Sequence, residues 1–110
     1  MKRYPPAPKH LKEHTRKWWR SIVREYDHQD HHLRLLEAAC VSWDRICAAR
    51  ELLDREGLVV KGRQGQRPHP AVAIERDAKT TFAKLLRDLD LDAEDPALVG
   101  LPIRRPKLGS

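Results

Sequence analysis

The segment that most constrains the fold runs from His31 to Glu56, where apolar side chains recur at helical spacing. We expect one helix there, roughly 40 Å long at about 1.5 Å per residue. Gly57 follows as a natural stop. Its apolar positions form two stripes: Leu33, Leu36, Cys40, Trp43 and Cys47, and Leu35, Ala39, Ile46, Ala49 and Leu53. A helix apolar over so wide an arc should be covered on two sides, one by the first helix and the other by a further helix or another subunit. We interpret the first stripe as core or oligomer interface.

Two shorter helices are expected to flank the long one. The first runs from about His10 to Tyr26, with Trp18 in the core and Trp19 more exposed, where it could stack on bases. The second starts near Pro70, a residue well suited to a first helical turn. Its expected buried face comprises Ile74, Ala78, Phe82, Leu85 and Leu89. Helix-to-helix packing then places the chain in the all-α class.

A short β-hairpin is expected near residues 58–68. Leu58, Val59 and Val60 favour a strand, and Gly62 and Gly65 permit a tight turn, whereas the prolines that follow prevent a long second strand. The predicted architecture is a long antiparallel helical hairpin with a short β-hairpin and a third helix. We divide the chain into a flexible basic arm (1–9), a helical core (10–92) and a flexible basic tail (93–110).

Positive charge is gathered in three places. Residues 1–27 carry eight Lys or Arg against three acids, whereas 58–70 and 96–110 each carry three against none, within a net charge of +6. Such clustering points to a polyanionic partner, above all nucleic acid. We predict that nucleic acid is held through its phosphates by Lys12, Arg16, Lys17, Arg20, Arg24, Lys61, Arg63 and Arg67.

The stretch YDHQDHH (residues 26–32) raises the question of a metal site. His28 and His32 would share a helical face, but a metal site needs three or four ligands held in place by a surrounding shell. Because the stretch lies where two helical patterns meet, we favour a helix boundary with Asp27 or Asp30 as the N-cap. A metal-dependent nuclease that uses His28, Asp30 and His32 remains a minor alternative.

Other catalytic patterns are missing from the sequence. There is no GxxxxGK[ST] loop to cradle the phosphates of ATP, no GxSxG, and no nucleophile with a base beside it. We therefore expect no catalytic residue, no metal and no cofactor. Cys40 and Cys47 are too far apart along one helix for an easy disulfide, which favours free thiols in a reducing cytoplasm. No apolar run approaches the length of a membrane span.

The ordered combination of segments resembles a known family. It comprises WW..IV.EY, LRLLEAAC, ARELLDREGLVV, GRQGQRPHPAVAIERDA and LLRDLDLD, over about residues 10–92. The sequence is similar to small subunits of the terminase of tailed phages, in the short branch often encoded beside an HNH endonuclease. The stretch from Gly57 to Ala78 carries the resemblance most specifically.

This resemblance implies a ring-like homo-oligomer that binds double-stranded phage DNA at the packaging start site. It further implies that the protein regulates the large terminase subunit, which supplies ATPase and nuclease. It also implies the cytoplasm of the infected bacterial host as the location and makes the HNH endonuclease a candidate partner. Longer small subunits carry an N-terminal helix-turn-helix domain, whereas residues 1–27 offer only one helix. The tail and the acidic segment 88–95 are candidates for docking the large subunit. Two rival functions stay open: a small helical transcription regulator that binds DNA as a dimer, and a protein-interaction adaptor that binds no DNA.

Overall fold

The computed structural model describes residues 3–91 and 108–109 of the chain. Three helices and one small antiparallel sheet follow in the order α1 (Glu13–Glu25), α2 (Asp30–Glu56), β1 (Val59–Gly62), β2 (Gly65–Pro68) and α3 (Pro70–Asp88). This agrees with the predicted mostly helical class with one β-hairpin.

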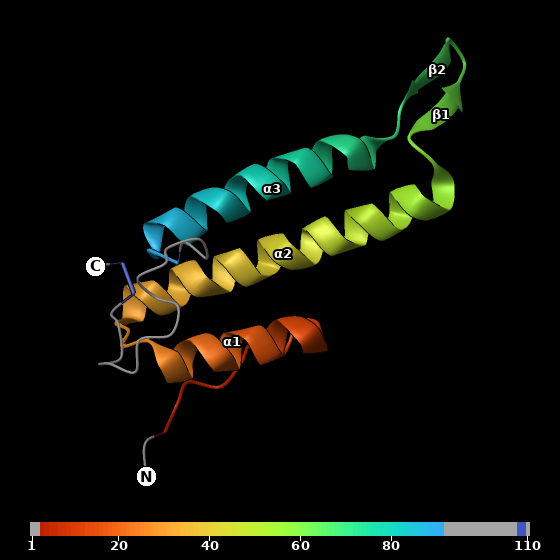
Figure 1. The fold of residues 1–110 in the computed structure, drawn as a ribbon. Helices are drawn as coiled ribbons and strands as arrows, with labels where there is room; N and C mark the ends of the chain where they lie inside the picture. The colour runs from red at the N-terminus through yellow and green to blue at the C-terminus, as the bar shows by residue number, and fades with distance from the viewer. Residues whose placement is uncertain (1–2, 92–107, 110) are drawn as a thin grey trace, which may run out of the picture.

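The long helix α2 is covered from two directions (Figure 1). The helix α3 runs antiparallel to it along much of its length and makes its most extensive contacts. The shorter α1 runs back along the first half of α2, and the β-hairpin joins α2 to α3 at the far end (Figure 1). The prediction that α2 needs two neighbours is therefore confirmed, and both neighbours come from the same chain.

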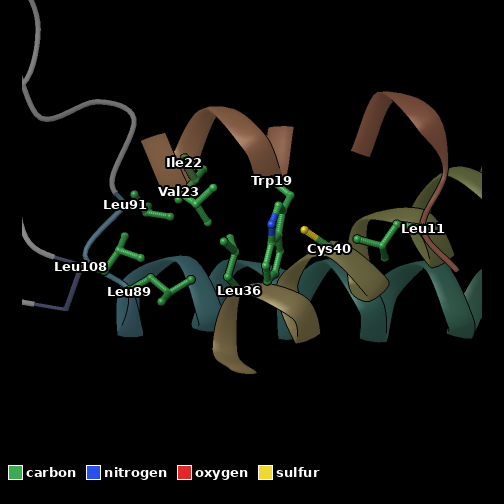
Figure 2. Packing of buried hydrophobic residues seen from close by; sticks show 9 residues of the cluster. All are labelled: Leu11, Trp19, Ile22, Val23, Leu36, Cys40, Leu89, Leu91 and Leu108. Atoms are coloured by element: carbon green, nitrogen blue, oxygen red, sulfur yellow. The ribbon is translucent and has the colours of Figure 1, made fainter. Parts of the chain in front are cut away.

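The main core lies where α1, the first half of α2 and the end of α3 meet. Figure 2 shows the buried side chains that converge there: Leu11, Trp19, Ile22, Val23, Leu36, Cys40, Leu89, Leu91 and Leu108. A smaller cluster of Ala49, Leu53 and Ala71 joins α2 to α3 near the hairpin.

The helix α1 begins at Glu13 rather than near His10. Lys12 has an extended backbone, with ψ of 154°, and its own side chain caps nothing. Instead, the Asp44 carboxylate of α2 accepts the backbone N–H of Lys12 at 2.9 Å and the hydroxyl of buried Thr15. A carboxylate from another helix thus performs the capping task that local residues usually perform. The helical periodicity of residues 10–12 could not reveal it.

The two neighbouring tryptophans have exchanged the places expected for them. Trp19 is 4% exposed, and its indole N–H donates to the Pro5 carbonyl oxygen at 3.1 Å. Trp18 is half-buried, and its ring lies 6.1 Å from that of Phe82 on α3. The prediction of an exposed Trp19 that could stack on bases is wrong, because residues 3–8 fold back over α1 and cover its indole.

The face of α3 was predicted with one error. Ala78 and Leu89 are buried and Phe82 and Leu85 are half-buried, but Ile74 is 51% exposed. Near the hairpin, α3 meets α2 through Ala71 and Val72. Ile74 lies at the flank of that contact, where no described element covers it.

The YDHQDHH stretch is a helix boundary, as predicted, but neither aspartate is the N-cap. Gln29 is the N-cap of α2: its side chain accepts from the backbone of His32, whose Nδ1 accepts the Gln29 backbone N–H at 3.0 Å. This reciprocal pair is a capping box. Asp30 lies in the first turn, where its charge complements the helix dipole.

The hairpin has the predicted glycine-flanked turn. Val59 pairs with Pro68 and Gly62 with Gly65, so that Arg63 and Gln64 form the turn. Gly65 has a φ of +102°, a backbone conformation that residues with a Cβ rarely adopt. The second strand ends at Pro68, as expected from the missing proline N–H.

The chain ends meet the helical body at a few described points. In the predicted basic arm, Ala7 packs against the main core. Leu108 is buried in that core, and its backbone N–H donates to the Asp27 carbonyl oxygen at 3.0 Å. The remaining predictions for the tail and for the end of the acidic segment concern residues 92–107 and 110, which lie outside the described residues. Over the part of the chain that the structure describes, no helix is long and apolar enough to cross a membrane.

Candidate nucleic-acid interface

The hairpin carries three exposed cations and no acidic residue. Lys61, Arg63 and Arg67 are exposed, and within residues 3–91 and 108–109 none of them forms an ion pair. The sequence holds no acidic residue between Glu56 and Glu75. The local field is therefore positive without an internal counterion, which suits a polyanion.

Four of the five predicted N-terminal cations lie in α1, and the fifth, Lys12, is its N-cap. Arg16, Arg20 and Arg24 follow one another at four-residue spacing and therefore share a face. That face also carries Glu13, whose carboxylate pairs with Arg16 and, at 3.4 Å, with Arg20. The hydrogen bond from Arg16 is the main reason that the pKa of Glu13 is lowered. Two of the five cations are thus partly neutralised, whereas Lys12, Lys17 and Arg24 remain exposed without a described ion pair.

The eight predicted cations form two separate groups. The start of α1 is tied to Asp44, near the middle of α2, whereas the hairpin follows Glu56, about 18 Å further along the helix axis. Figure 1 shows α1 beside the first half of α2 and the hairpin at its opposite end. A single chain therefore does not bring the two groups into one patch.

His69 links the end of α2 to the start of α3, a role that no sequence pattern indicates. Its Nδ1 accepts the backbone N–H of Ala71 at 3.0 Å, and so caps α3. The neutral ring then carries its proton on Nε2, which lies 3.0 Å from the Glu56 carboxylate at the end of α2. This bond, followed by one from Arg55, lowers the pKa of Glu56. The buried imidazole of His69 thereby connects the end of α2 with the start of α3, the two helices that the hairpin joins.

The predicted core or interface stripe divides into two parts. Leu36 and Cys40 are fully buried, and Leu33 packs against the same core. Burial raises the pKa of the Cys40 thiol to about 12, with smaller effects from the charges of Asp44 and Glu37. Both cysteines are free thiols.

The other part of the stripe reaches the surface. Trp43 is 39% exposed, and its ring centroid is 5.4 Å from that of Phe82. Cys47 is half-buried, with its sulfur 3.9 Å from Nε2 of His14. Together with Trp18, the Trp43 and Phe82 rings join all three helices at a partly exposed aromatic cluster.

A second apolar surface lies at the base of the hairpin. Leu58 is 59% exposed and Val59 is 54% exposed, and both line a shallow depression with Pro68 and Val72. We call this surface the hairpin-base patch. Exposed apolar surface of this kind can serve as a contact for a partner.

The histidine-rich boundary does not form a metal-binding arrangement among the described residues. His28, His31 and His32 line one depression with Leu108 and Gly109. Nevertheless, within residues 3–91 and 108–109 no three side chains of His, Cys, Asp or Glu come together as metal ligands would. The Nδ1 of His32 is engaged by the capping box.

These features define a small helical protein with a projecting basic β-hairpin and exposed apolar surfaces. The family described as phage terminase, small subunit, matches residues 15–100. The chain therefore belongs to the phage terminase small-subunit family, as its resemblance predicted. Comparison with curated proteins and with solved structures gave no match. Membership indicates a role in phage genome packaging, in a subunit that is generally non-catalytic.

Proposed function

We propose that this chain is the small terminase subunit of a tailed phage, which binds viral double-stranded DNA at the packaging start site. In this role it regulates a large subunit that supplies the ATPase and the nuclease, in the cytoplasm of the infected host. The observation that carries the proposal is the family match over residues 15–100. The acid-free hairpin, whose three cations form no ion pair among the described residues, supports DNA as the ligand.

The proposal includes a homo-oligomer, for which the exposed apolar surfaces are the support. The aromatic cluster lies where the three helices meet, whereas the hairpin-base patch lies on the hairpin and the start of α3. Two different surfaces that meet between neighbouring copies make a head-to-tail contact, and such contacts close into rings when the rotation allows. In an oligomer the two groups of cations would also be repeated around the particle, so that one duplex could contact both.

The salt dependence of duplex binding tests the DNA part of the proposal. Each phosphate contact releases counterions, so the logarithm of the association constant should fall linearly with the logarithm of salt concentration. The triple variant Lys61→Ala, Arg63→Ala and Arg67→Ala should weaken binding and flatten the slope by about one per lost contact. The matched control is Arg76→Ala on α3, an exposed arginine that pairs with Asp77 at 3.3 Å. An affinity that does not change with salt would contradict the proposal.

Regulation of the large subunit needs its own assay. Purified large subunit should hydrolyse ATP at a different rate when the intact small subunit and duplex DNA are added. A rate that stays unchanged over a range of small-subunit concentrations would contradict this part of the proposal. The acidic residues Asp88 and Asp90 are the described members of the proposed docking segment and are the first to substitute.

A further inference from the structure

The end of the hairpin offers side chains that suit recognition of bases as well as phosphates. Arg63 and Gln64 form the turn, and Gln66 follows in β2. All three side chains are exposed, and in the described part of the chain none has a hydrogen-bond partner. Arginine pairs with the major-groove edge of guanine and glutamine with that of adenine. By contrast, Arg16 and Arg20 of α1 form ion pairs with Glu13.

The strand register places a cation on each face of the hairpin. Lys61 lies opposite Gln66 and Val60 opposite Arg67. Because side chains alternate between faces along a strand, Lys61 and Arg67 point to opposite faces. The Arg67 side chain crosses the hairpin over Gly62, where an added Cβ would lie 3.2 Å from its Nε. A hairpin with a cation on each face suits a groove that has phosphates on both walls.

The dimensions select one groove. A single sheet layer with its side chains is about 10 Å thick, judged from the spacing of packed sheets. The major groove of B-DNA is about 12 Å wide and admits a two-stranded ribbon, whereas the minor groove is only about 6 Å wide. The hairpin projects beyond the ends of α2 and α3 (Figure 1), so its tip can enter a groove ahead of the helices.

We propose that the hairpin is the sequence-reading element: its tip enters the major groove of duplex DNA, where Arg63 and Gln64 contact base edges. Lys61 and Arg67 contact phosphates on the two walls. The basic face of α1 supplies phosphate contacts that carry no sequence information. The bond between His69 and Glu56 holds the hairpin at a fixed angle to the helices and so limits the entropy lost on binding. This inference rests on the proposed DNA-binding function and specifies which segment reads the sequence.

The test begins with selection of bound duplexes from a random pool by the full-length chain. Affinity is then measured for a selected duplex and for a scrambled one. Gln64→Ala should reduce the ratio of the two affinities by roughly 5- to 150-fold while leaving the scrambled duplex and the salt slope unchanged. Lys61→Ala and Lys17→Ala should instead weaken both duplexes equally and reduce each slope by about one. Thr81→Ala, at an exposed position on α3, is the neutral control.

Modified bases identify the groove. Replacing the purines of the selected duplex by their 7-deaza forms removes the N7 acceptors of the major groove. This change should weaken binding by the wild-type chain more than by Gln64→Ala, whereas inosine in place of guanine, which removes a minor-groove donor, should affect the two proteins equally. Thermal unfolding of each variant confirms that the fold is retained.

The outcomes separate this inference from the function on which it rests. If duplexes are bound with a salt slope but Gln64→Ala keeps the full preference, the reading role of the hairpin is wrong and DNA binding stands. If the inosine duplex discriminates the two proteins and the 7-deaza duplex does not, the choice of groove is wrong. A chain that binds no duplex at any salt concentration contradicts both proposals.

Discussion

The carboxylate of Asp44 should determine whether α1 stays attached to α2. It accepts the backbone N–H of Lys12 at 2.9 Å and the hydroxyl of Thr15, which is only 1% exposed. Asp44→Ala removes both acceptors and leaves the Thr15 hydroxyl without its partner. Loss of an N-cap costs about 1 kcal/mol, and loss of a hydrogen bond to a charged group costs about 1.5–3 kcal/mol. Because Asp44 is only half-buried, we expect a total of about 2–3 kcal/mol.

Hydrogen exchange measures this loss locally, whereas the global stability of the proposed oligomer would depend on protein concentration. The amides of α1 should exchange roughly 30- to 150-fold faster in Asp44→Ala than in the wild type. Amides of α3 beside the hairpin should change far less. Thr15→Val, which removes only the hydroxyl, should show part of the effect.

The matched control is Asp54→Ala on the same helix. Asp54 is exposed and pairs only with Arg50, at 3.1 Å, within the described structure. A surface pair four residues apart contributes about 0.3–0.5 kcal/mol, so this variant should exchange nearly as the wild type does. Equal protection of α1 in both variants would refute the capping role of Asp44.

Three further predictions follow from burial and titration. Trp43→Asp should dissolve the oligomer or unfold the chain, whereas a variant with wild-type mass and stability would contradict its role in the interface. Burial, followed by the charges of His31 and His28, lowers the pKa of His32. The contribution of His32 to stability is therefore fully present above about pH 6.5 and is lost as the pH falls through the pKa of the folded state. When the pH is lowered from about 6.5, the urea concentration at the unfolding midpoint should decrease less in His32→Gln than in the wild type. In native protein at pH 8, half-buried Cys47 should react with a thiol reagent well before Cys40, whose pKa is about 12; equal rates would contradict the burial of Cys40.

The fold was largely predictable because strong local signals agreed with the tertiary structure. The apolar periodicity of residues 31–56 required cover on two sides, and α1 and α3 supply it. Gly57, Gly65 and Pro70 marked the end of α2, the turn and the start of α3, where backbone geometry limits the choice of residue. The positive charge of the hairpin was predictable because residues 58–70 contain three Lys or Arg and no acidic residue.

The errors arose where distant residues decided the outcome. Trp19 is buried because Pro5 and its neighbours fold over it, and helical phase contains no information about that arm. The helix α1 starts at Glu13 because Asp44, about 30 residues away, completes its first turn. The N-cap Gln29 needs His32 as its reciprocal partner. Because this pairing is unusual, the sequence favoured a neighbouring aspartate as the N-cap. His69 reads in the sequence as part of a loop, although its ring joins α2 to α3.

The mass of the particle in solution, measured by light scattering with and without duplex DNA, tests the central claim most directly. The account predicts a closed homo-oligomer many times the 12.8 kDa mass of one chain, which gains the mass of bound DNA at low salt and loses it at high salt. A particle that remains a monomer at all concentrations, with or without DNA, would contradict it. A dimer that binds DNA would favour the transcription regulator instead.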